Sequence, residues 1–435
     1  MDNPEETGSV VQESSGSAGI SDDSTFPLSP RVLFQVFWAA LRLGLTSFGG
    51  PIAHLGYFRE EYVVRRKWLD EQSYADVVAL SQSLPGPASS KVGIIVGTIR
   101  AGLPGAVLAW LGFTLPSALA LIMFGYGIQQ FTVADAGWLH GLKLAAVAVV
   151  AQAVWGMSRN LAPDRSRATI AIVAAILTLT WSKGMSAIFG FDWPSALTPV
   201  LIIVVAGAVG WRLLAVPASQ TDRVAISKRI RPWMGIVALV LFFTLLIGLP
   251  SLRQVFSENE TLAVVDSFYR SGSLVFGGGH VVLPLLQSEV VAPGWVSEEA
   301  FLAGYGATQA VPGPLFTFSA YLGTVMKPEP NGAIGGFIAL GAIFLPAFFL
   351  TIGPLPFWDM MRRRPAFQSV LRGVNAAVVG LLLAALYDPV WTSAVKGAPD
   401  FALAAAALGL LMLWKFPPWL VVVLAALGGA GLAMI

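Results

Sequence analysis

Long apolar runs recur along almost the whole chain, and they constrain its fold more than any other feature. The main runs cover residues 105–124, 142–157, 169–181, 197–209, 233–249, 332–352 and 402–413. The longer ones match the roughly 30 Å hydrocarbon core of a bilayer, which takes about 20 helical residues to cross. The composition agrees, since 55% of the residues are hydrophobic and 12% are charged, about half the charged share of a soluble protein. The sequence predicts an all-α, polytopic membrane protein.

Composition also excludes several classes of function. The chain has no cysteine, which rules out disulfides, thiolate metal sites and thiol redox chemistry. With three histidines, we expect no cofactor and no metal site. A net charge of +2 gives no reason to expect nucleic acid as a partner. No Walker loop and no nucleophile elbow is present, so the sequence does not predict an enzyme.

The N-terminal segment, residues 1–30, differs from the rest of the chain. Its acidic side chains have no basic neighbours, and its middle is rich in serine and glycine. This composition is typical of a disordered tail. The segment lacks the basic and apolar regions of a cleavable signal peptide.

Three motifs occur twice and in the same order. Residues 41–51 align with residues 269–279, which pairs Arg42 with Arg270 and places Phe-Gly-Gly in both copies. A Pro-Gly-Pro sequence follows at residues 85–87 and again at 312–314, and a Leu-Pro pair lies inside a later apolar run of each copy. Three matches in order indicate an internal repeat. We assign the first copy to residues 31–215 and the second to residues 259–435.

The distribution of basic residues predicts that the two copies are inserted in opposite orientations. Residues 59–67 contain four basic side chains, whereas the matching residues 287–299 contain none. The pattern then reverses, because residues 129–140 have none and residues 362–364 are three arginines. By the positive-inside rule, corresponding loops lie on opposite sides of the membrane. A basic loop and one connector helix, residues 216–258, would join two inverted repeats of about six hydrophobic segments each.

Glycine and proline interrupt the motif segments, and two interpretations remain open. A helix over residues 31–46 would be about 24 Å long, too short for a full crossing. It runs into Gly49-Gly50-Pro51 and then into a basic loop. We favour a re-entrant hairpin over a simple crossing, because a hairpin keeps Arg31, the loop and Arg100 on the cytoplasmic face.

Broken helices at corresponding places in two inverted halves point to a transporter's binding site. Each break creates a helix N-terminus with free N–H groups and a partial positive charge, which favours an anion. The predicted substrate-binding residues are Arg42, Ser47, Phe48, Gly49, Gly50, His54, Gln82, Pro85, Gly86, Pro87, Ser89, Ser90, Arg270, Phe276, Gly277, Gly278, Gly279, His280, Gln309, Pro312, Gly313 and Pro314. The alternative is that these glycines and prolines only permit close helix packing or kinks.

Charged side chains within the apolar segments are candidates for anion attraction. Arg42 and Arg270 occupy matching positions, and an arginine at membrane depth indicates function unless its side chain extends to the interface. Lys91 has no basic counterpart in the second copy, so we rank it lower. His54 and His280 could bind an oxyanion or carry a proton, or could simply be hydrogen-bonded at helix ends.

Acidic residues cluster in the basic loop of the first copy. They are Glu60, Glu61, Asp70 and Glu71. We expect these four carboxylates to form a solvated amphipathic face.

Several strings resemble the chromate ion transporter family. They are residues 47–59, 82–90, 100–102, 276–280, 283–285 and 311–314. The resemblance covers the chain from about Arg31 onward and is to the long, two-domain members. It implies chromate efflux across the bacterial inner membrane and chromate resistance, with sulfate as a structural mimic of the substrate.

The electrostatics of export agree with this expectation. A dianion that leaves a cell with a negative interior gains about 4.6 kcal/mol per 100 mV. Alternatives are a transporter of another oxyanion such as sulfate, and a membrane-embedded chromate reductase, which would need a redox centre. The expected partners are chromate, sulfate as a competitor, and membrane lipid, and a homodimer is left open.

Overall fold

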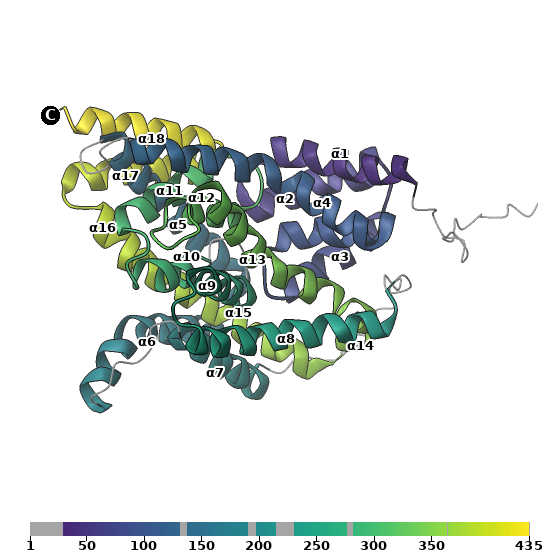
Figure 1. The fold of residues 1–435 in the computed structure, drawn as a ribbon. Helices are drawn as coiled ribbons and strands as arrows, with labels where there is room; N and C mark the ends of the chain where they lie inside the picture. The colour runs from purple at the N-terminus through teal and green to yellow at the C-terminus, as the bar shows by residue number, and fades with distance from the viewer. Residues whose placement is uncertain are drawn as a thin grey trace, which may run out of the picture.

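The computed structural model describes residues 29–130, 137–189, 197–214, 230–275, 282–362 and 364–434. Within these ranges the chain is helical and contains no strand (Figure 1). The first part contains α1 (Pro30–Thr46), α2 (Gly50–Arg59), a π-helical segment (Glu60–Arg65), α3 (Glu71–Ser83), α4 (Ala88–Gln130), α5 (Gly137–Leu161), α6 (Arg165–Phe189) and α7 (Leu197–Leu213). The predicted acidic tail lies outside the described residues, apart from Ser29 and Pro30.

The rest of the chain begins with the predicted connector helix, α8 (Pro232–Val255). It continues through α9 (Glu260–Leu274), α10 (Val282–Leu286), a π-helical segment (Gln287–Val291), α11 (Glu298–Ala310), a 3₁₀ turn (Leu315–Thr317), α12 (Phe318–Val325), α13 (Gly332–Ile352), a second 3₁₀ turn (Leu355–Phe357), α14 (Trp358–Arg362), α15 (Pro365–Ala385), a third π-helical segment (Leu386–Trp391), α16 (Thr392–Ala394), α17 (Ala398–Met412) and α18 (Pro418–Leu432).

Five helices of the described chain are long and apolar enough to cross a membrane. They correspond to α4, α5, α8, α13 and α15, the last two extended by the short elements that follow them. Shorter apolar helices include α7, α12, α17 and α18. These helices confirm the prediction of an all-α polytopic membrane protein.

The long helix α4 is two arms rather than one rod. Ala101 and Gly102 have non-helical backbone angles, and Gly102 has a φ of +61°. A Cβ atom on Gly97 would overlap the carbonyl oxygen of Gly105, although in a straight helix these residues would be about 12 Å apart. The chain therefore reverses at Ala101–Gly102. Gly323 at the end of α12 makes the same close approach to Gly335 in α13.

Both Pro-Gly-Pro sequences lie at the tips of helical hairpins. In the first hairpin, α3 and the first arm of α4 have their outer ends together, since the guanidinium carbon of Arg100 lies 4.9 Å from the Trp68 ring centroid. In the second, α11 and α12 likewise meet at their outer ends, where Lys327 N donates to Trp295 O at 3.0 Å. Helices of 13 residues such as α3 and α11 are about 20 Å long. Each arm is thus shorter than a bilayer core.

The chain also folds back around the first Phe-Gly-Gly motif, and again between α9 and the π-helical segment Gln287–Val291. Arg42 in α1 lies 3.6 Å from Glu61 in the π-helical segment after α2, measured from Nη1 to Oε2. A continuous helix would separate these residues by about 28 Å. In the second half, Arg270 Nη2 lies 2.8 Å from Glu289 Oε2. The backbone therefore has the hairpin form that we favoured over a straight crossing, and α1 covers nearly the predicted residues 31–46.

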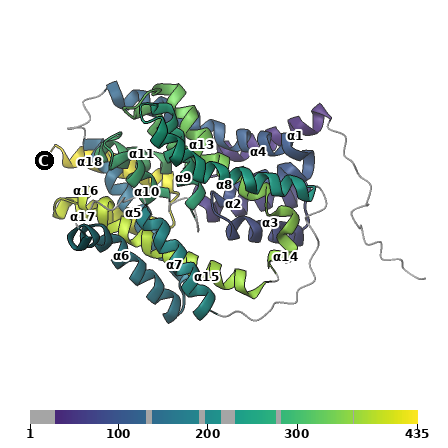
Figure 2. The same ribbon diagram turned by 60° about the horizontal axis from the view of Figure 1, so that its bottom comes forward.

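Helices of the two halves pack against one another, so the halves do not form separate units. Helix α7 of the first half packs on α15 of the second, and α18 of the second packs on α5 of the first. Glycine allows both contacts, because Gly210 meets Gly373 and Gly429 meets Gly141 with no room for a side chain. Small residues permit such close approach between apolar helices. Figure 2 shows α6, α7 and α15 side by side along one edge of the molecule.

Helix α8 connects two distant ends of the molecule. Near its start, Ile230 belongs to one apolar cluster with Tyr62 and Trp358. Near its end, the guanidinium carbon of Arg253 lies 5.6 Å from the Trp295 ring centroid. Twenty-four helical residues span about 36 Å. Helix α8 therefore extends from the cluster that contains Tyr62 and Trp358 to the vicinity of Trp295.

Candidate functional site

The two Pro-Gly-Pro breaks each contact the opposite half of the chain. Gly86 N donates to Val275 O at 2.6 Å, and Gly313 N donates to Ser47 O at 2.9 Å. Ser47 directly precedes Phe48-Gly49-Gly50, and Val275 directly precedes the matching Phe-Gly-Gly-Gly. Each Pro-Gly-Pro tip thus contacts the base of the opposite Phe-Gly-Gly motif.

Backbone conformation explains why glycine occupies both tips. Gly86 has a φ of +102° and Gly313 a φ of +103°, a region that side chains disfavour. A Cβ atom on Gly313 would lie 2.7 Å from Ser117 Oγ, whereas one on Gly86 would lie 3.5 Å from Ala347 Cβ. Ser117 and Ala347 each directly follow a Leu-Pro pair of the repeat. All three duplicated motifs therefore lie at the same two contacts.

Helix N-termini lie at the tips, as the sequence predicts. Helix α2 begins at Gly50 after Gly49, which has a φ of +93°. Helix α4 begins directly after the first Pro-Gly-Pro, and a 3₁₀ turn leading into α12 begins directly after the second. The fourth predicted N-terminus, after Gly278-Gly279, lies outside the described residues. The three described N-termini place partial positive charge where the halves meet.

Several polar side chains at the tips are buried and have an atom with no hydrogen-bond partner among the described residues. They include Ser47 Oγ, Ser90 Oγ and Gln309 Nε2. Ser89 is also buried. A buried polar group without a partner costs about 1–3 kcal/mol, so such groups indicate a place for water or for a polar ligand.

The remaining predicted residues differ in where the structure places them. Pro87 and Pro314 are buried at the tips, and Pro85 and Pro312 are partly exposed there. Gln82 is exposed, unlike its counterpart Gln309. The Phe48 ring lies 6.4 Å from that of Trp419 in α18. A further set lies outside the described residues: Phe276, Gly277, Gly278, Gly279 and His280.

The structure places His54 in an aromatic cluster. Its side chain is 1% exposed. Its ring centroid lies 5.5 Å from that of Phe113 in an edge-on arrangement and 6.3 Å from that of Phe58. Its predicted contact with an anion or a proton stays a prediction.

Arg42 and Arg270 are held by carboxylates. Arg42, whose side chain is 49% exposed, pairs with Glu61. Arg270 pairs with both Asp266, at 3.0 Å, and Glu289. Both guanidinium groups therefore join the two arms of a hairpin, and their role as anion ligands stays a prediction.

The expectation that Glu61 belongs to a solvated face is wrong. Glu61 is 4% exposed and also pairs with Arg65 and Arg66. The sequence contained a signal, because the same spacing of nineteen residues separates Arg42 from Glu61 and Arg270 from Glu289. A carboxylate repeated in register with a repeated arginine predicts an ion pair.

The sequence assigns Lys91 a low rank as a candidate, but the structure buries it completely. The side chain is fully buried in the first turn of α4. Its ammonium donates to Leu84 O, and to Pro85 O at 3.0 Å. These carbonyl groups lie at the end of α3, directly before Gly86.

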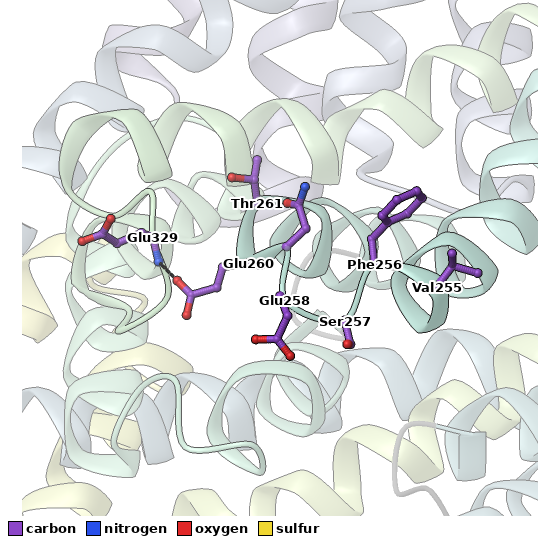
Figure 3. A pocket seen from close by; sticks show the side chains of 8 residues that line it. Val255, Phe256, Ser257, Glu258, Glu260, Thr261 and Glu329 are labelled. Atoms are coloured by element: carbon purple, nitrogen blue, oxygen red, sulfur yellow. Dashed lines mark hydrogen bonds between the residues drawn. The ribbon is translucent and has the colours of Figure 1, made fainter.

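A surface pocket lies elsewhere, at the turn between α8 and α9. It is lined by residues 255–261 and Glu329, and Glu329 N donates to Glu260 (Figure 3). Three of its lining residues are glutamates: Glu258, Glu260 and Glu329. Like charges repel, so this pocket does not suit an oxyanion. The described residues contain no group of three or more His, Cys, Asp or Glu that could hold a metal ion.

Comparison with known proteins assigns the chain. The sequence model of the family described as chromate transporter matches residues 34–211 and 262–430. The chain belongs to the chromate transporter family. The two matched regions fall within the two halves of the predicted repeat, and membership makes the chain a transporter rather than an enzyme.

The chain is similar to several known proteins, over different lengths. A chromate transport protein of Pseudomonas aeruginosa is 28% identical over 97% of both chains. A probable chromate transport protein of Synechococcus elongatus is 25% identical over 89% of this chain and 93% of the relative. The uncharacterized transporter YwrA of Bacillus subtilis is 30% identical over 38% of this chain and 78% of its own length. No solved structure matches the chain.

Proposed function

We propose that this chromate transporter family member exports chromate across the cytoplasmic membrane, and that the anion passes where the four hairpin tips meet. The reciprocal hydrogen bonds Gly86–Val275 and Gly313–Ser47 carry the proposal. They bring broken helices from both halves to the same place, which is the arrangement of transporter sites. Irregular backbone is tolerated at membrane depth where it is enclosed by protein or lines a cavity.

The donors at the tips suit a tetrahedral dianion. Helix N-termini offer backbone N–H groups, and Ser47, Ser90 and Gln309 offer buried side-chain donors. Hydrogen bonds to a charged acceptor are stronger than those between neutral groups. Sulfate has the same shape and charge as chromate. Relatives of this chain are named for chromate transport, so chromate is the substrate that we propose.

We further propose that the hairpins enter the bilayer from opposite sides. Arms of about 20 Å from each side would bring their tips together near the middle of a roughly 30 Å core. The cluster of Tyr62 with Ile230, just before α8 begins, and the contact of Arg253 with Trp295 near the end of α8 support this layout. Because the natural chain has no cysteine, single cysteines at Arg66 and Glu299 test it by labelling of intact cells. We expect only the Glu299 position to be labelled from outside, and labelling of both from one side would contradict the inverted layout.

The membrane potential would drive export. Moving two negative charges outward across 100 mV releases about 4.6 kcal/mol, which corresponds to a concentration ratio of roughly two thousand. No nucleotide hydrolysis is then required.

Flux measurements on the purified, reconstituted chain test the proposed function. Proteoliposomes loaded with labelled chromate should release it faster when the compartment that holds chromate is made electrically negative. Unlabelled sulfate in excess should compete weakly, and the chromium should stay hexavalent. Release that matches protein-free liposomes would refute chromate transport, and reduced chromium would favour the reductase alternative.

A further inference from the structure

Lys91 combines three properties that together indicate a functional role. It is fully buried, it follows the first Pro-Gly-Pro by four residues, and it lies in the short first arm of α4, before the reversal at Ala101–Gly102. A buried ammonium without a compensating charge carries a large desolvation cost. Such a group in a membrane helix indicates function.

Its hydrogen bonds leave the charge uncompensated. The ammonium donates to Leu84 O and Pro85 O, which are neutral groups. The buried carboxylates of Glu61 and Asp266 have ionic partners, but no ion pair of Lys91 with a carboxylate is present in the described residues. An ammonium has three N–H donors, so the two carbonyl bonds leave one donor for another ligand.

Two adjacent residues, Pro85 and Gly86, place this donor close to the first Pro-Gly-Pro tip. Pro85 accepts from Lys91, and the next residue, Gly86, donates to Val275. The neighbouring Ser90 is buried, and its hydroxyl has no partner among the described residues. Lys91 therefore lies where the first Pro-Gly-Pro tip meets Val275 at the end of α9.

We propose that Lys91 is the fixed positive charge that the transported oxyanion neutralises at this contact. The inference rests on the proposed function and assigns its central electrostatic residue. The matching position in the second half is Phe318, so the site would carry one lysine and not two. A single positive charge lowers the cost of bringing a dianion into the membrane without holding it so tightly that release is prevented.

A purely structural role is the competing explanation, because Lys91 also caps the carbonyl end of α3. Substitutions separate the two roles. Lys91→Gln retains a donor for the carbonyls and removes the charge, whereas Lys91→Arg retains the charge. We expect Lys91→Gln to weaken chromate binding about 10- to 100-fold, the usual effect of losing a hydrogen bond to a charged group. Lys91→Arg should lose less.

The absence of natural cysteine allows a direct test of the charge. In Lys91→Cys protein, aminoethyl methanethiosulfonate adds an ammonium on a chain close to the length of lysine, and methyl methanethiosulfonate adds a neutral group. Only the aminoethyl reagent should restore chromate flux. Lys143→Cys, at a partly buried lysine of α5 outside the hairpins, is the matched control and should respond to neither reagent.

The outcomes separate failure of this inference from failure of the proposed function. Wild-type protein that neither binds nor transports chromate would overturn both. Active wild-type protein with Lys91→Gln at full affinity would overturn the role of Lys91 alone, as would equal restoration by the neutral reagent. If Lys91→Cys does not yield monodisperse protein, chromate affinity of the Gln and Arg variants, measured by calorimetry on folded protein, decides the question.

Discussion

The two Pro-Gly-Pro hairpins share a backbone and differ in their side chains. Their central glycines have φ values of +102° and +103°, and each donates to the residue that precedes the opposite Phe-Gly-Gly motif. The first hairpin contains the buried Lys91, where the second has the apolar Phe318. The second buries Gln309, whereas Gln82 of the first is exposed.

This difference separates two requirements of a site built from a repeat. Backbone geometry is duplicated because both halves must close around one path. Charge is not duplicated, because a second buried cation would add its own desolvation cost. In our proposal, glycine and proline shape the backbone that both halves share, and the electrostatics depend on Lys91, a side chain present once.

The largest expected effect comes from placing a branched side chain on either tip. Gly86→Val and Gly313→Val should each abolish chromate transport, because β-branched residues strongly disfavour a φ near +100°. The measurement is transport per molecule of folded, reconstituted protein. Gly56→Ala in α2 is the control, since a Cβ there meets no atom within 4 Å, and it should transport normally.

Alanine sharpens the comparison between the tips. Gly313→Ala should be more harmful than Gly86→Ala, because its Cβ would lie 2.7 Å from Ser117 Oγ, whereas that of Gly86 would make an ordinary contact of 3.5 Å. Equal activity of both alanine variants would show that Ser117 moves aside. Normal transport by both valine variants would remove the tips from the proposed path.

The next effect concerns the ion pairs that join the arms of the Phe-Gly-Gly hairpins. Arg270→Ala should lower the free energy of unfolding by about 3–5 kcal/mol, because it removes the ion-pair partner of the buried Glu289. Arg42→Ala should cost about 1 kcal/mol or less, as expected for an exposed arginine, because Glu61 keeps Arg65 and Arg66. Chemical unfolding in detergent measures both.

Chromate affinity of the same variants tests the sequence-based expectation for these arginines. If the arginines only hold the hairpins, folded Arg42→Ala protein should bind chromate as the wild type does. A loss of affinity in Arg42→Ala without a loss of stability would restore its role as an anion ligand.

Much of this architecture could be predicted from the sequence, because repeated glycine and proline report on backbone shape. The duplicated motifs predicted the breaks, the hairpin form and the short α1. The packing of α7 on α15 and of α18 on α5 was not predictable, because it depends on contacts such as Gly210–Gly373 between distant segments. The sequence gives no direct measure of which apolar faces pair.

The sequence predicted the environments of the charged side chains less well than it predicted the backbone. Glu61 looked like part of a charged, solvated loop because five basic and acidic neighbours surround it in sequence, yet the fold buries it against Arg66. The sequence alone gives Lys91 a low rank, because the second half has no basic residue at the matching position. The presence of a lysine in only one half becomes informative once its burial is known, because a buried ammonium carries a desolvation cost that an exposed lysine does not.

The smallest expected effect distinguishes the two glutamines of the repeat. Gln309→Leu removes a buried amide whose Nε2 has no partner among the described residues, so it should stabilise the protein by about 1 kcal/mol if the amide has no ligand. If the amide donates to chromate, the same change should also weaken chromate binding about 2- to 10-fold, the loss of one modest hydrogen bond. Gln82→Leu, at the exposed counterpart, should change neither quantity. Calorimetric affinity and thermal unfolding of both variants, with and without chromate, separate these cases. Chromate binding that is unchanged in Gln309→Leu but weakened in Gln82→Leu would reverse the comparison and place the anion nearer the first hairpin's outer face.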